Sequence, residues 1–282
     1  MSEASKLHVD PEIYPKWEKI KDMTDQLIDI MLNLRQSGHP GGSRSKVHIM
    51  VSLFLGGPMR WDIRNPQKRF GDKFVLSAGH TVPGIYALLA VLNEAMIRKY
   101  KETGDEKYRL PPADRVLSWP DLLTLRNKGG LPGHAEMAGK TNLFKANTGP
   151  SGHGMPVAVG EALALKYAGA EDVRVFAVEG EGGLTPGVTH ESLNSAYGLG
   201  LGNLHFLVDW NDYGIDNRPF SSVVNGTPED WFAPHGWRVF GTENGSEWEG
   251  VNTAMLEMAF DENSEGAPAM AWFKTRKGRG YG

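Results

Sequence analysis

We predict an α/β fold with a doubly wound, mainly parallel sheet and helices on both faces, from three features of the sequence. Short apolar runs such as Val173–Val178 and Asn203–Asp209 suit strands that are buried on both faces. Longer segments with apolar residues at three- and four-residue steps alternate with these runs, as in βαβ units. Glycine-rich turns follow the predicted strands, at the edge where such folds bind ligands.

The composition is that of an ordinary globular chain. It has 282 residues, of which 40% are hydrophobic and 23% are charged. We expect a single domain over residues 1–282, with residues 1–14 as a flexible arm. The net charge of −4 gives no support for binding to nucleic acid or to an anionic membrane. The chain has no cysteine, which excludes disulfides and thiolate metal sites.

Neither a signal peptide nor a membrane span is predicted. The first ten residues, MSEASKLHVD, are polar. No uninterrupted apolar run approaches the ~20 residues that cross a bilayer. We therefore expect a cytoplasmic protein that does not contact a membrane.

Two helices are predicted in the first 55 residues. Trp17–Gln36 is amphipathic, and Gly38 lies just past its end, where a left-handed residue is favoured. A second helix is expected over about Ser45–Leu55. We expect the nearby cations Arg44 and Lys46 to be solvated or at an interface.

Three histidines share one local setting, a turn rich in glycine. His39 lies in SGHPGGS, His80 follows the predicted strand Lys73–Leu76 in SAGH, and His134 ends GGLPGH. Each alone is as readily a structural histidine as a functional one. Because all three share this setting, three independent structural roles are less plausible. Neutral imidazoles can instead orient a phosphate or relay protons near pH 7.

Another glycine-rich loop, Asn147–Gly154, precedes a predicted helix over about Met155–Ala168. It lacks the Gly-Lys-Ser/Thr sequence of a Walker motif. Its glycines would let backbone amides approach a ligand closely.

The central βαβ unit carries oxygen ligands at two adjacent strand ends. Gly180-Glu181-Gly182 follows the first strand, a helix spans about Thr189–Leu199, and Asn211 follows the second strand. A carboxylate, an amide oxygen and a backbone carbonyl would suit octahedral Mg²⁺ together with phosphate oxygens. An ordinary strand–helix turn is the alternative interpretation of the glycines alone.

The last third is less informative. Trp231–Phe240 suits a helix end and a strand, Gly250–Phe260 a helix, and Pro268–Phe273 a last strand. We expect Thr275–Gly280 to be a basic, mobile tail.

Together these segments resemble the amino-terminal, diphosphate-binding domain of the transketolase family. The matching motifs occur in the family's order: SGHPGG at Ser37–Gly42, LSAGH at Leu76–His80, LPGH at Leu131–His134, NTGPSGHG at Asn147–Gly154, GEG followed by Asn over Gly180–Asn211, and TRKGRG at Thr275–Gly280. In the thiamine diphosphate motif of the family, Gly-Asp-Gly precedes the Asn by about thirty residues, and here residues 183–210 lie between Gly182 and Asn211.

The resemblance implies a thiamine-diphosphate-binding fold, with thiamine diphosphate and Mg²⁺ as cofactors. Its implied metal ligands are Glu181, Asn211 and the Tyr213 carbonyl. The implied cofactor contacts are His80, Gly149, Ser151, Gly180, Glu181, Gly182 and Asn211. The implied catalytic residues are His39, His80 and His134, which would assist proton transfers of a sugar substrate while the cofactor breaks the bond.

The chain also departs from the family. Glu181 replaces Asp, Ser151 and His153 replace Leu and Gln, and Pro186 replaces a Glu that links paired sites, whereas Glu191 is kept. In the family, a further domain supplies the Glu that activates the aminopyrimidine, and we expect a partner chain to supply that domain and a further family histidine.

The resemblance therefore implies the amino-terminal subunit of a split transketolase. Such a subunit would transfer a two-carbon ketol unit between sugar phosphates, as a homodimer or heterotetramer with a pyrimidine-domain partner. The alternatives are another thiamine-diphosphate-dependent ketol-transferase and a degenerate, non-catalytic binding protein.

Overall fold

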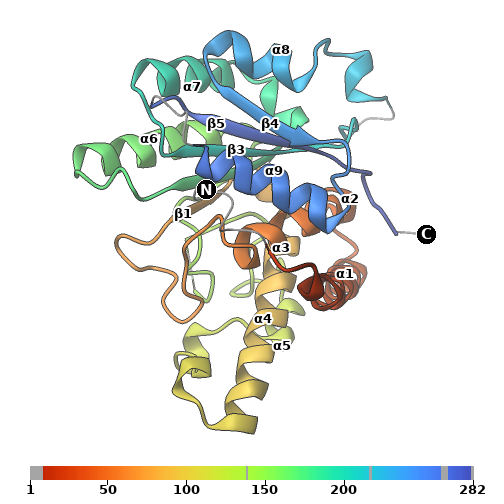
Figure 1. Cartoon of the computed structure of the whole chain (residues 1–282). Helices are drawn as coiled ribbons and strands as arrows, with labels where there is room; N and C mark the ends of the chain where they lie inside the picture. The colour runs from red at the N-terminus through yellow and green to blue at the C-terminus, as the bar shows by residue number, and fades with distance from the viewer. Residues whose placement is uncertain (1–8, 138, 216–217, 262–265, 281–282) are drawn as a thin grey trace.

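The computed structural model describes residues 9–137, 139–215, 218–261 and 266–280. Its sheet has the strand order β1-β2-β3-β5-β4, and every neighbouring pair is parallel. The strands are β1 (Lys73–Leu76), β2 (Val175–Gly180), β3 (Leu204–Trp210), β4 (Arg238–Thr242) and β5 (Ala269–Lys274). Because all strands run the same way, their carboxyl ends share one edge of the sheet (Figure 1).

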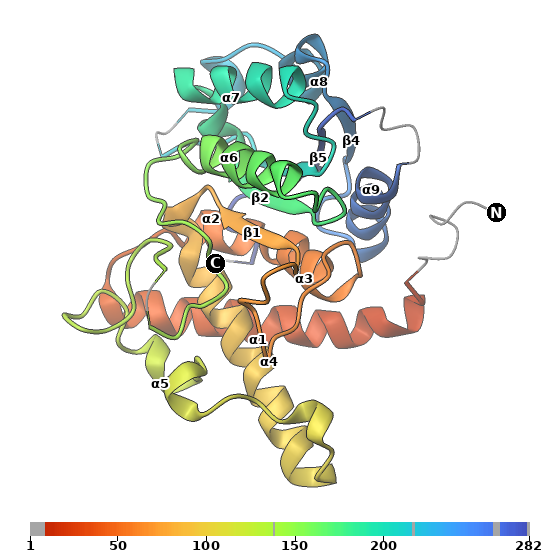
Figure 2. The same cartoon turned by 90° about the vertical axis from the view of Figure 1, so that its left-hand side faces the viewer.

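Helices cover both faces of this sheet, which confirms the predicted α/β class. One core cluster joins the sheet to α1 (Tyr14–Arg35), α3 (Val47–Leu55), α4 (Val82–Thr103) and α9 (Trp248–Phe260). The other joins it to α6 (Gly154–Tyr167), α7 (Gly187–Gly198) and α8 (Pro228–Phe232). Figure 2 shows α6, α7 and α8 on one side of the strands, with α1 and α4 on the other.

The apolar runs form strands because both of their faces are covered. Phe176 and Val178 of β2 belong to the first core cluster, whereas Val175 and Ala177 belong to the second. Successive side chains of a strand point to opposite faces, so a strand between two helical layers needs apolar residues throughout. This explains why polar and apolar residues do not alternate in these segments of the sequence.

Helix α4 and the turn before it form the one apolar segment, within the described residues, that is long enough to cross a bilayer. The segment spans Gly79–Thr103, and 72% of its most apolar window is buried inside the domain. Its apolar residues pack against β1 and α1, as in the core helix of a globular domain.

The structure corrects the predicted amino-terminal arm in part. Pro11–Ile13 forms a 3₁₀ turn, and Val9, Ile13 and Tyr14 pack against the first core cluster. These apolar contacts hold residues 9–14 against the domain. Residues 1–8 lie outside the described residues.

The end of α1 also differs from expectation. Gln36, rather than Gly38, has the left-handed conformation, with φ 50° and ψ 34°. Gly38 has φ 131°, and a Cβ on it would come within 2.4 Å of the Leu32 side chain. Its backbone conformation and this close contact, and not a left-handed helix cap, therefore require glycine there. Next comes a short helix that the pattern did not predict, α2 (Pro40–Ser45), with proline in its first turn.

Candidate functional site

A cleft of about 950 Å³ lies at the carboxyl edge of the sheet. Segments that are far apart in the sequence line it: α2, the turns after β1, β2 and β3, and the segment after β5. The predicted site residues that line it are His39, His80, Ser151, Gly180, Glu181, Gly182, Asn211 and Tyr213. The structure therefore brings most of the predicted site together, and the remaining two residues lie beside it.

The three glycine-flanked histidines converge at one end of the cleft. The ring centroids of His39 and His80 lie 4.9 Å apart, with the planes nearly perpendicular at 78°. His134 lies next to Gly149, where an added Cβ would be 3.8 Å from the His134 ring. His134 is also close enough to contribute to the lowered pKa of both other histidines.

His39 and His80 both have a pKa below the ordinary value for histidine, so both imidazoles are neutral at pH 7. Burial, followed by the nearby charge of Arg126, lowers the pKa of His39. Burial and the ammonium of Lys46 lower the pKa of His80 to about 3. Neutral imidazoles can each donate one hydrogen bond and accept another at pH 7, which suits them to contact hydroxyl and phosphate groups.

Glu181 and Asn211 meet where β2 and β3 end. The Asn211 backbone N–H donates to Glu181 Oε2 at 3.2 Å, and Asn211 Oδ1 accepts from the Tyr213 N–H at 3.1 Å. Glu181 is 1% exposed, and its Oε1 is buried without a hydrogen-bond partner. Burial and the neighbouring Asp209 raise the pKa of Glu181 to about 7. A buried carboxylate oxygen without a partner is where a cation would be stabilised.

Glu179, which the sequence analysis did not single out, fixes the glycine-rich loop to the sheet. Its carboxylate accepts hydrogen bonds from Ser77 Oγ at 2.6 Å, from the Gly152 N–H at 2.7 Å and from the Gly180 N–H at 2.9 Å. Burial raises the pKa of this fully enclosed group. The loop is thereby held against the turns after β1 and β2.

Gly152 in this loop has a conformation that requires glycine. Its φ is +81°, and a Cβ there would lie 2.5 Å from the Gly183 carbonyl oxygen. The close approach brings the loop directly onto the turn that carries Glu181. Ser151, one residue earlier, consequently lines the cleft.

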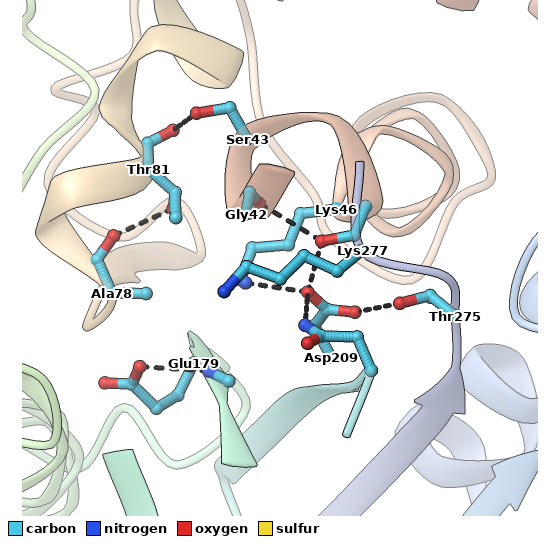
Figure 3. A network of polar contacts seen from close by, with 12 residues as sticks. Gly42, Ser43, Lys46, Ala78, Thr81, Glu179, Asp209, Thr275 and Lys277 are labelled. Atoms are coloured by element: carbon cyan, nitrogen blue, oxygen red, sulfur yellow. Dashed lines mark hydrogen bonds and ion pairs between the residues drawn. The ribbon is translucent and has the colours of Figure 1, made fainter. Parts of the chain in front are cut away.

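A buried charge network surrounds Asp209 (Figure 3). Asp209 accepts from Ser45 Oγ at 2.5 Å, from Lys46 Nζ at 2.8 Å, from Asn211 Nδ2 at 2.9 Å and from Thr275 Oγ1. Asp209 and Lys46 are 0% and 2% exposed, respectively. These contacts tie α2 and the segment after β5 to the end of β3.

The expectation that Lys46 and Arg44 are solvated is therefore wrong, and so is the expectation of a mobile tail over Thr275–Gly280. Lys46 is not solvated, because it pairs with Asp209, and Arg44 is buried and pairs with Asp29 at 2.7 Å. The segment Thr275–Gly280 is no mobile tail: Thr275 contacts Asp209, and the Lys277 ammonium donates to the Tyr213 carbonyl at 3.2 Å. Hydrogen bonds to buried groups order it.

Comparison with protein families identifies one match. The family described as "Transketolase, thiamine diphosphate binding domain" matches residues 117–281. Transketolase 2 of Xanthobacter flavus is 34% identical over 255 residues, covering 87% of this chain and 33% of that protein. Transketolase of Halalkalibacterium halodurans is 32% identical and covers 86% and 34%, respectively. The chain thus spans about a third of the length of these relatives.

Solved structures give the same result. Transketolase from Leishmania mexicana superposes with a TM-score of 0.78 at 27% identity, covering 94% of this chain and 37% of that one. Transketolase from Campylobacter jejuni gives 0.78 at 26% identity, covering 97% and 39%. The described α/β architecture is therefore that of the corresponding part of these enzymes.

Proposed function

The chain belongs to the transketolase family and carries its thiamine diphosphate binding domain, and from this premise we propose that it supplies the diphosphate-binding half of a ketol-transfer site. The reaction would move a two-carbon ketol unit between sugar phosphates. The proposal rests on Glu181, which lines the cleft beside Asn211 and has one buried carboxylate oxygen, Oε1, without a hydrogen-bond partner.

The residues present are compatible with a metal ion. Within the described residues, no group of three or more His, Cys, Asp or Glu side chains could hold one. Mg²⁺, however, needs only one or two carboxylates when phosphate and water oxygens complete its octahedron. Glu181 and the Asn211 amide oxygen would be its ligands, and Glu181 is one methylene longer than the Asp of the family.

The glycines of the β2–α7 turn would leave room for the diphosphate. A Cβ on Gly182 would meet no atom within 4 Å, so its backbone borders open space. The cofactor contacts we propose are His80, Gly149, Ser151, Gly180 and Gly182. When bound, thiamine diphosphate supplies the nucleophilic carbon that breaks the bond next to a ketone.

The histidines would handle the protons of the sugar. His39, His80 and His134 lie at the cleft, and the lowered pKa of His39 and of His80 keeps both imidazoles neutral. A neutral imidazole accepts a hydroxyl proton and returns it in a later step. The chain's own contribution is thus to bind, orient and move protons.

We further propose that a pyrimidine-domain transketolase subunit completes the site, in a heterotetramer or a related dimer in the cytoplasm. The relatives are about three times as long as this chain, which is consistent with a site built from more than one domain.

Co-expression tests this proposal. The chain is purified with and without the product of a neighbouring gene that encodes a pyrimidine domain, and ketol transfer is assayed with thiamine diphosphate and Mg²⁺. Activity of the pair and none of the chain alone is expected. Turnover by the chain alone would contradict the split site, and an inactive pair that still binds the cofactor would favour the degenerate alternative, which Pro186 in place of Glu motivates.

A further inference from the structure

Lys277 brings a second ammonium group into the cleft, next to that of Lys46 (Figure 3). Its Nζ donates to the carbonyl oxygens of Tyr213 and Gly214, the former at 3.2 Å. Lys46 has Asp209 as its counter-ion, whereas no carboxylate of the described residues lies within ion-pair distance of Lys277. The charge of Lys277 is thus directed at carbonyl dipoles and at the cleft.

The position of Lys277 is built by two distant segments. A Cβ added to Gly41 would lie 3.0 Å from Lys277 Cγ and 3.3 Å from its Cε, so the lysine stem passes over a glycine of α2. The Gly278 N–H donates to the Gly41 carbonyl at 3.2 Å. The glycine-rich SGHPGG segment therefore leaves the space through which the ammonium enters the cleft.

Two cations would compete for the same carbonyl. The Tyr213 oxygen is the backbone ligand expected for Mg²⁺, and the ammonium of Lys277 already donates to it. Lys277 also interacts electrostatically with Glu181 and Asp209. Burial and the positive charge of Lys46 lower the pKa of Lys277. A dication bound at the Tyr213 carbonyl itself would lie beside this ammonium and be repelled by it, so a metal ion on Glu181 and Asn211 would have to do without that carbonyl.

We propose that the Lys277 ammonium is a resident cation for the cofactor diphosphate, taking the place of a metal ion at the Tyr213 carbonyl. This rests on the proposed function, namely that the chain binds thiamine diphosphate. A diphosphate in the cleft would gain a charge-assisted hydrogen bond from Lys277. Its binding should then depend only in part on Mg²⁺.

Calorimetric titration of the full chain with thiamine diphosphate tests the proposal, in Mg²⁺ and in chelator. Wild type should lose no more than about tenfold in affinity on chelation. Lys277→Gln should lose about ten- to a hundredfold more in chelator but little in Mg²⁺, the range of one hydrogen bond to a charged group. Arg276→Gln removes the same charge from an exposed neighbouring side chain and should match wild type.

Gly41→Ala gives a second, charge-neutral variant, because its methyl group displaces the lysine stem. Gly41→Ala should lose less affinity for thiamine diphosphate than Lys277→Gln does, and only in chelator. It provides the test of the proposal if Lys277→Gln does not fold. Equal losses on chelation for wild type and the variants would overturn the role of Lys277. Absence of binding by wild type in both conditions would overturn the proposed function itself.

Discussion

Lys46 Nζ lies 2.8 Å from Asp209 Oδ2, and this buried pair borders the cleft through Lys46. The pair joins α2, which begins after His39, to the end of β3, which precedes Asn211. It therefore sets the distance between the histidine end and the Glu181 end of the site.

Lys46→Met should destabilise the domain by about 3–5 kcal/mol, because it leaves the buried Asp209 without its cation. Urea denaturation measures the change in the free energy of unfolding. Lys99→Met is the control, since Lys99 pairs with Glu102 on the surface and its loss should leave the free energy of unfolding almost unchanged. Equal, small effects of both changes would contradict the structural role of Lys46.

Glu181→Gln should stabilise the metal-free chain at alkaline pH. Burial raises the pKa of Glu181 from 4.5 to about 7, so the folded state holds this proton more tightly than the unfolded state. The free energy of unfolding consequently falls as the pH rises between these two values. The variant lacks this loss and should be more stable than wild type by about 2–3 kcal/mol near pH 8, but not near pH 4.

Denaturation in chelator at several pH values measures this difference. A stability difference between Glu181→Gln and wild type that does not change with pH would show that Glu181 has an ordinary pKa in the folded chain.

Glu179→Gln should loosen the glycine-rich loop. The carboxylate accepts from three donors, and a glutamine amide nitrogen cannot accept from any of them. The amide oxygen can replace only one of the two carboxylate oxygens, so at least one of the three donors is left unsatisfied, at a cost of about 1–3 kcal/mol. Amide hydrogen exchange should accelerate at Gly152 and Gly180. The exposed Glu171, changed to Gln, is the control, and unaltered exchange in Glu179→Gln would contradict the anchoring role.

The sequence predicted the sheet and most of the cleft, because both arise from local patterns. Apolar runs identified the strands, and the turns after parallel strands all lie at one edge of the sheet, so Glu181, Asn211 and His80 were found together. Residues of this kind can be recognised by their type and by their position after a strand.

The contacts of the two lysines that line the cleft, Lys46 and Lys277, could not be predicted in this way. The sequence predicts Lys46 to be solvated or at an interface and Lys277 to lie in a mobile tail, since their partners Asp209 and Tyr213 lie far away in the sequence. A lysine looks the same in a sequence whether its counter-ion is a buried carboxylate or water. The signals available were Glu179 and Asp209, carboxylates at the ends of strands that are otherwise apolar.

Calorimetric titration with thiamine diphosphate and with thiamine, both in Mg²⁺, tests the central claim most directly. The chain should bind thiamine diphosphate but not thiamine at the same concentrations, and Asn211→Ala should weaken binding at least about tenfold, the loss of one strong ligand contact. Glu171→Gln should bind as wild type does. Equal binding of thiamine and thiamine diphosphate, or full affinity in Asn211→Ala, would contradict a diphosphate site at the ends of β2 and β3.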